Sequence, residues 1–253
     1  MMSGFKRKRL VCLLLHFTLL WCVIPAHAAD AITIAVAANF ARPLEEIKQR
    51  YETKTDSPVK VTIASSGTLY AQIMNGAPYD LFLSADRERP ARLYENGRCL
   101  EPFEYAWGRA VLWSKKPGII KENNWLAAAR NEQAKRIAIA NPKLAPYGMV
   151  LWPALTDIYS TEERQRKLIY GQNVAQAFQF GVSGAVDAAF ISLSFALSPE
   201  GMAGNYWEIP EAEEVNQWGC ITAETTNRQG AEIFVQELQS AAGKNLLKRY
   251  GYR

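Results

Sequence analysis

The sequence lacks an apolar run of the roughly twenty residues that a membrane-spanning helix needs. Its one pronounced run, Leu10–Ile24, has about fifteen residues. Lys6, Arg7, Lys8 and Arg9 precede this run, and Ala26-His27-Ala28 follows it. This order is typical of a cleavable secretory signal peptide, so we expect residues 1–28 to be removed and the rest of the chain to be exported to the periplasm.

Histidine is absent from the rest of the chain, because both histidines, His16 and His27, lie in the expected signal peptide. A chain without imidazole has no Ser-His-Asp or Cys-His catalysis, no HExxH zinc motif and no histidine general base. Those classes of hydrolase and metalloprotease are therefore excluded, and we do not expect an enzyme.

Cysteine is scarce, and only Cys99 and Cys220 lie outside the expected signal peptide. An even pair in an oxidising compartment allows one disulfide, whereas two buried free thiols would act as small apolar side chains. The sequence leaves both alternatives open. Cys12 and Cys22 lack the small-residue context of a lipoprotein cleavage site, which favours a free protein over a lipid-anchored one.

Excess charge of either sign is also lacking. Four of the 29 basic residues and none of the 25 acidic residues lie in residues 1–28, so 25 of each sign remain. A balanced chain has no electrostatic footprint for nucleic acid or for an anionic membrane surface. We therefore expect no nucleic-acid partner.

Strands and helices alternate along the chain. In the first part we expect strands at 31–37, 59–64 and 79–85 and helices at 40–53 and 68–75. Further on we expect strands at 108–113, 136–140, 167–171, 188–193 and 219–226, and helices at 147–159, from 174 and over the last 25 residues. This alternation predicts an α/β fold of parallel sheets flanked by helices.

Several strands end in a short polar loop that opens a helix. Such loops contain Asn39, Ser66, Tyr147 and Val174. Each helix start leaves about four N–H groups without intrahelical partners and carries about half a positive charge, so several starts meeting in one cleft would form an anion site. Asn39 and Ser66 have a second interpretation, because both residue types are also favoured helix caps.

Motifs of enzymes and nucleotide sites are missing or incomplete. GVSGA at 181–185 lacks the last glycine of a nucleophile elbow, and no phosphate-binding glycine loop occurs. Ser57 and Lys60 match S-x-x-K without its companion motifs, which leaves a secreted Ser/Lys hydrolase, using Ser57 or Ser66, as a weak alternative. Asp80 and Asp86 could form a metal pair, but ion-paired or capping carboxylates explain them better.

Four stretches resemble the periplasmic molybdate-binding components of bacterial ABC transporters. They are AVAANF at 35–40, ASSGTLYAQIMNGAPYDLFLSAD at 64–86, NPKLAPYG at 141–148 and LLKRYGY at 246–252. The resemblance implies a two-lobed type II periplasmic binding protein fold, with a mostly parallel sheet flanked by helices in each lobe. It implies lobe I at 29–110 and 219–253 and lobe II at 111–218, with crossings near 107–113 and 215–220.

The same resemblance implies the ligand and its contacts. Molybdate or tungstate would bind between the lobes to Asn39, Ser66, Tyr147 and Val174, mainly through main-chain N–H groups, with side-chain help from the first two. No metal ligand and no cofactor are implied. Many members have serine in place of Asn39 and a tyrosine near Phe190, Ile191 and Ser192; a subgroup resembles this chain in both respects.

The implied chemistry replaces water around a dianion with neutral donors, each worth about 1.5–3 kcal/mol net. The implied partner is a membrane permease, and we expect a monomer. Sulfate or another oxyanion remains the alternative ligand. The sequence does not decide between molybdate and tungstate, and it does not identify the surface that docks on the permease.

Overall fold

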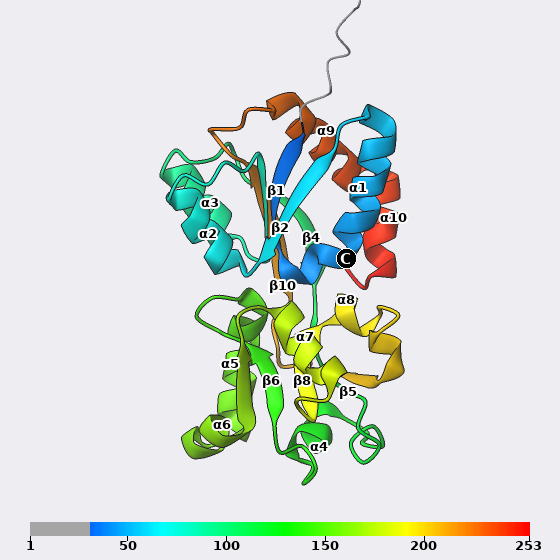
Figure 1. Ribbon diagram of the computed structural model, residues 1–253. Coiled ribbons are helices and arrows are strands. Elements are labelled where there is room, and N and C mark those ends of the chain that lie inside the picture. The colour runs from blue at the N-terminus through cyan, green and yellow to red at the C-terminus, as the bar shows by residue number, and fades with distance from the viewer. Residues whose placement is uncertain (1–30) are drawn as a thin grey trace, which may run out of the picture.

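The computed structural model describes residues 31–253, so the expected signal peptide lies outside the described residues. The chain forms two lobes, one above the other in Figure 1, each built on a five-stranded sheet with helices on both faces. The α/β, two-lobed architecture expected from the sequence is confirmed. None of the helices among residues 31–253 has the length and hydropathy needed to cross a membrane.

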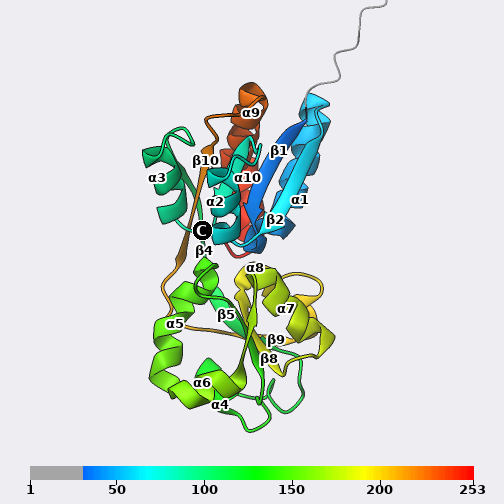
Figure 2. The same ribbon diagram turned by 60° about the vertical axis from the view of Figure 1, so that its left-hand side comes forward.

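Lobe I contains both ends of the described chain. Its strands are β1 (Ile32–Ala37), β2 (Val59–Ala64), β3 (Leu81–Ser84), β4 (Phe103–Gly108) and β10 (Val215–Ile221), in the order β2-β1-β3-β10-β4. Its helices are η1 (Ala38–Phe40), α1 (Ala41–Thr55), α2 (Ser66–Met74), α3 (Glu88–Glu95), α9 (Arg228–Gln239) and α10 (Ala241–Arg249). Helices α2 and α3 cover one face of the sheet, and α1, α9 and α10 cover the other (Figures 1 and 2).

Lobe II repeats this arrangement. Its strands are β5 (Ala110–Ser114), β6 (Ile137–Ala140), β7 (Leu168–Gly171), β8 (Ala188–Ser192) and β9 (Asn205–Glu208), in the order β7-β6-β8-β5-β9. Its helices are α4 (Trp125–Arg130), α5 (Pro146–Ile158), α6 (Thr161–Lys167), α7 (Val174–Ser183), α8 (Leu193–Ala196) and η2 (Gly201–Ala203). In each lobe three parallel strands are followed by one antiparallel strand and then a fifth.

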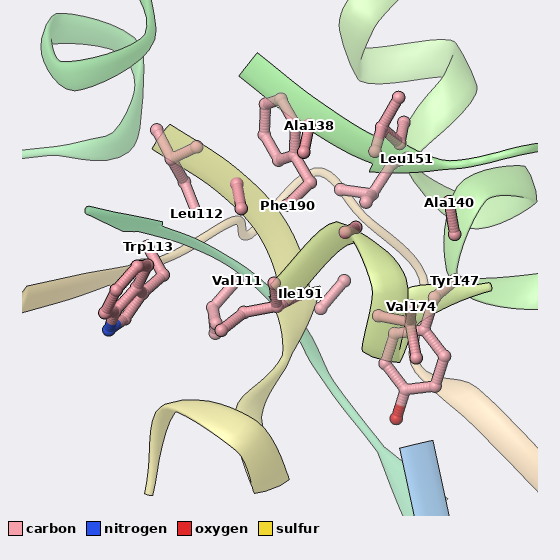
Figure 3. Packing of buried hydrophobic residues seen from close by; sticks show 14 of the residues in the cluster. Val111, Leu112, Trp113, Ala138, Ala140, Tyr147, Leu151, Val174, Phe190 and Ile191 are labelled. Carbon is pink, nitrogen blue, oxygen red and sulfur yellow. The ribbon is translucent and has the colours of Figure 1, made fainter. Parts of the chain in front are cut away.

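Both sheets are covered on two faces, and their central strands are accordingly mostly apolar. In β6 and β8 every residue is buried. Figure 3 shows the core of lobe II, where Trp113, Phe190 and Leu151 belong to one buried cluster. Burying a side chain of this size stabilises the fold by about 1.5–3 kcal/mol. Continuous apolar runs of this kind are typical of parallel sheets packed between helices.

The sheets place the crossings near the expected ranges 107–113 and 215–220 but displace one lobe boundary. The first crossing lies between β4 and β5, at Arg109, close to the expected 110/111 boundary. The return crossing precedes Val215, since β10 pairs with β3 and β4 along its length, so the expected boundary at 218/219 would cut one strand in two. The expected strand at 219–226 is correspondingly displaced. The sequence pattern does not reveal the start of β10, because polar residues follow Val215. One of them, Gln217, is nevertheless fully buried through hydrogen bonds rather than apolar contacts.

Asp80 links the start of α9 to the sheet of lobe I through hydrogen bonds. Its carboxylate accepts hydrogen bonds from the main-chain N–H of Thr33 (2.7 Å), from the Thr225 hydroxyl (2.6 Å) and from the main-chain N–H of Thr226 (3.2 Å). Asp86 pairs with Arg89 and accepts its main-chain N–H. Both carboxylates therefore have structural partners, as the ion-pair and capping interpretation predicted, and no three His, Cys, Asp or Glu side chains cluster for a metal anywhere in residues 31–253.

Cys99 and Cys220 are free thiols buried together in lobe I. Cys99 bridges to Thr222, two residues beyond Cys220 on the same stretch of chain, and the two thiols interact directly. Burial, first, and the contact with Cys99, second, raise the pKa of Cys220 well above its ordinary value. Of the two alternatives left open by the sequence, the structure has the buried thiol pair.

We expect both thiols to be inert in the folded protein, because both are buried away from a reagent in solution and burial raises the pKa of Cys220, which disfavours its thiolate. In protein from which residues 1–28 have been cleaved, a thiol reagent should label neither cysteine before unfolding and both after unfolding in denaturant. The control is the number of cysteines labelled in unfolded protein that was reduced beforehand. Absence of reactive thiols in the unfolded, unreduced sample would instead show that a disulfide forms.

Candidate anion-binding site

A small cavity lies where the two lobes meet. Its lining residues are Ala37, Ala38, Asn39, Ser65, Ser66, Ala85, Ala145, Pro146, Tyr147, Asn173 and Val174. Its volume is about 10 Å³, close to the space that one ordered water molecule requires. In this closed arrangement it therefore has no room for an extended organic ligand. None of the lining residues carries a formal charge.

Serines open helix α2 at one wall of the cavity. Ser65 is the N-cap, and its hydroxyl accepts the main-chain N–H of Thr68 at 3.2 Å. The expectation that Ser66 itself caps the helix is therefore wrong. Ser66 is the first helical residue, and its hydroxyl oxygen accepts the main-chain N–H of Ala85 at 2.9 Å. That bond leaves the hydroxyl hydrogen of Ser66 available for donation to a ligand.

Asn39 lies in the short helix η1, but its side chain does not donate into the cavity. The side-chain nitrogen donates to Gln217 Oε1 at 2.8 Å and to the Tyr252 hydroxyl at 3.0 Å. An amide nitrogen has two hydrogens, and these two bonds use both. The expected amide contribution and the expected capping role are both wrong, since η1 has no side-chain cap. What Asn39 presents to the cavity is its main chain.

Tyr147 and Val174 begin the two helices of the opposite wall. Pro146 is the first residue of α5, where its fixed φ suits the helix, and Tyr147 follows it. Asn173 caps α7 by accepting the main-chain N–H of Gln176 at 3.0 Å, and Val174 is the first helical residue. The N–H groups of Tyr147 and Val174 have no carbonyl one turn back to donate to.

The phenol of Tyr147 points away from the core of lobe II. In Figure 3 its ring lies beside Val174 with the oxygen directed out of the cluster. The oxygen is buried without a hydrogen-bond partner, although Tyr252 and Asn39 lie close enough to influence its pKa. Burial is the main cause that raises the pKa of Tyr147 well above its ordinary value. The phenol is therefore neutral and keeps its O–H hydrogen.

A buried polar network beneath the cavity ties the lobes together. The Tyr252 hydroxyl donates to the Asn39 carbonyl at 2.9 Å, and the Ser194 hydroxyl of lobe II donates to the same carbonyl at 2.9 Å. Burial raises the pKa of Tyr252 to about 12, so this hydroxyl too is neutral. No local sequence pattern indicates this network, because its members come from η1, α8, β10 and the chain end.

All four residues expected at the site, Asn39, Ser66, Tyr147 and Val174, line this cavity. Helices α2, α5 and α7 all begin there, so their free N–H groups and positive dipole ends meet in one place. Three helix starts on neutral residues form an electropositive cavity without a cation. The lining also contains residues that the sequence did not single out as contacts, among them Ser65, Ala85 and Asn173.

Residues considered for other roles lie elsewhere. The Ser57 hydroxyl donates to the Thr55 carbonyl, and Lys60 is exposed on β2, so no pairing supports a Ser/Lys hydrolase. Phe190 and Ile191 are buried in the core of lobe II, and Ser192 bonds to Ser194 at 2.8 Å. None of these three lines the cavity, so this strand supplies no substitute for the tyrosine hydroxyl of other members.

Comparisons with known proteins agree with this geometry. The family profile described as "Bacterial extracellular solute-binding protein" matches residues 32–253. "Molybdate-binding protein ModA" of Azotobacter vinelandii is 34% identical over 98% of this chain and 98% of its own length. The protein of the same name from Rhodobacter capsulatus is 31% identical over 90% of each chain.

A solved structure is also similar. The periplasmic molybdate-binding protein of Azotobacter vinelandii superposes with a TM-score of 0.81 at 32% identity, covering 88% of this chain and 98% of that one. The matches span nearly the whole described chain and both lobes. The chain belongs to the bacterial extracellular solute-binding protein family.

Proposed function

We propose that this protein is a periplasmic solute-binding protein that captures molybdate or tungstate between its lobes and delivers it to the membrane permease of an ABC transporter. The observation that carries the proposal is the closed, uncharged cavity at which α2, α5 and α7 begin. The names of the relatives that are more than 30% identical support the choice of anion.

Main-chain donors replace the water shell of the anion in this mechanism. The proposed donors are the N–H groups of Asn39, Ser66, Tyr147 and Val174, with the Ser66 hydroxyl as the side-chain donor. Each hydrogen bond to a charged group contributes about 1.5–3 kcal/mol net. Because the donors are divided between the lobes, the anion bridges them and stabilises the closed form.

The same donors provide selectivity. Hydrogen phosphate carries an O–H that needs an acceptor, and N–H groups offer none, so one buried polar group stays unpaired at a cost of about 1–3 kcal/mol. Sulfate has the charge of molybdate but is smaller, so its hydrogen bonds in a cavity fitted to the larger anion are stretched. Both effects favour molybdate and tungstate.

The remaining parts of the proposal follow from the residues. We propose a monomeric binding protein without catalytic activity or cofactor, exported through cleavage of residues 1–28. The cavity contains no nucleophile paired with a base, since no histidine lies in residues 31–253 and no lysine lines the cavity. The balanced charge of residues 29–253 supports the absence of a nucleic-acid partner.

A panel of oxyanions tests the function. Molybdate and tungstate at 100 times their dissociation constants should stabilise the protein by about 2.7 kcal/mol, which raises its melting temperature by about 5–10 °C. Sulfate and phosphate at the same concentration are the controls and should shift it little. A shift with sulfate alone would reassign the ligand, and no shift with any oxyanion would refute the proposal.

Ser66→Ala should weaken molybdate binding about 10- to 100-fold, because it removes one hydrogen bond to a charged ligand. Calorimetric titration measures the effect. Ser57→Ala is the matched control, since the Ser57 hydroxyl donates to the Thr55 carbonyl and lies outside the cavity, so this variant should bind with wild-type affinity. Wild-type affinity in Ser66→Ala would show that its hydroxyl does not face the anion.

Molybdate affinity should be constant from about pH 6.5 to pH 9. Tyr147 is the titratable residue of the lining, and its raised pKa keeps the phenol neutral over this range. Loss of its proton would place a negative charge beside the dianion and weaken binding, but only at higher pH. A tenfold change in affinity within the range would reveal a titrating group at the site.

A further inference from the structure

Gly67 occupies a position where helix formation alone would favour another residue. It is the second residue of α2, between Ser66 of the cavity wall and Thr68. Alanine stabilises a helical backbone better than glycine, because glycine loses more conformational freedom on folding. A glycine here therefore needs a reason outside its own helix.

The other lobe provides that reason. The main-chain N–H of Gly67 donates to the carbonyl of Leu144 in lobe II at 2.9 Å. A Cβ built on Gly67 would lie 2.8 Å from that carbonyl oxygen and 3.2 Å from Leu144 Cα. Distances below 3.0 Å force one of the groups to move, and here the obstacle is backbone rather than a flexible side chain.

Leu144 belongs to a loop that is held by its own hydrogen bonds. The main-chain N–H groups of Leu144 and Ala145 donate to the Asn141 carbonyl at 3.0 and 2.9 Å, and Asn141 donates to Gly171 at 2.7 Å. Lys143 donates its main-chain N–H to the Asn141 side chain at 3.0 Å. The loop leads directly into α5, so moving it would move Pro146 and Tyr147 of the cavity. Displacing this loop to make room for a larger side chain at position 67 would therefore cost free energy.

The ion pair between the lobes is less suited to control closure. Arg42 of α1 pairs with Glu200 of lobe II at 2.6 Å, but both side chains are 44% exposed. Exposed ion pairs contribute little free energy. The bond from Gly67 to Leu144, in contrast, joins the chain segments that carry the starts of α2 and α5.

We infer that Gly67 is a positioning residue for closure. Its missing side chain lets the start of α2 meet the loop before α5, and this contact brings the donors of both lobes within reach of one anion. Gly67 does not itself line the cavity. The inference rests on the proposed function for its effect on affinity, whereas its effect on the separation of the lobes does not depend on which anion binds.

Gly67→Ala and Ala71→Gly form a matched pair for the test. Ala71 is exposed in the same helix. The Ala71→Gly variant therefore reports the difference in helix stability between alanine and glycine without a contact to lobe II. We expect Gly67→Ala to bind molybdate at least tenfold more weakly while the melting temperature of the anion-free protein stays equal or rises. Ala71→Gly should do the opposite: lower the melting temperature and keep the affinity.

Lobe separation is measured in parallel. Spin labels on Glu95→Cys of α3 and Glu162→Cys of α6, both exposed, report the distance between the lobes, since Cys99 and Cys220 are buried. With molybdate, the wild type should show a shorter distance than Gly67→Ala. Equal distances and equal affinities would overturn the inference.

The two proposals fail in different ways. If the wild type bound none of the oxyanions, the proposed function would fail, and the inference would be tested by the anion-free distances. A smaller closed population in Gly67→Ala than in the wild type would support it. Equal populations would overturn it.

Discussion

Unpaired main-chain N–H groups are the constraint on which the rest of this structure depends. Helices α2, α5 and α7 begin at one cavity, and the first turn of each leaves donors that no carbonyl of its own helix can satisfy. Because buried N–H groups in proteins are usually paired, an uncharged cavity with such donors in its wall favours an acceptor inside it. A compact oxyanion is such an acceptor, and its charge suits the positive ends of the helices.

The two lobes create this arrangement through their shared topology. In each sheet the parallel strands end at the lobe interface, where the loops after β2, β6 and β7 lead to α2, α5 and α7. Ligands of open α/β sheets bind at the carboxyl ends of the strands for this reason. The crossings before β5 and before β10 lie beside the cavity network, because Gln217 of β10 bonds directly to Asn39. Hinge and cavity are therefore neighbours.

The residues at the interface between the lobes have different roles. Asn39 and Tyr252 use their side chains on each other and on Gln217, which satisfies buried groups that would otherwise destabilise the closed lobes. Ser66 keeps its hydroxyl hydrogen because its oxygen accepts from Ala85. Gly67 contributes by having no side chain at all. Side chains thus shape and hold the cavity, while the main chain supplies most of the donors proposed for the anion.

The sequence by itself determined the fold class, most element positions and the four residues that meet at the cavity. Apolar periodicity and strand–loop–helix junctions are local patterns, so they can be recognised in the sequence alone. Only the tertiary structure decided that Ser65 rather than Ser66 caps α2, that the Asn39 amide turns toward Gln217, and that β10 begins at Val215. Each of those outcomes depends on a partner more than a hundred residues away or on competition between adjacent residues for one N–H. No local pattern contains that information, because it depends on how the elements of lobe I pack together.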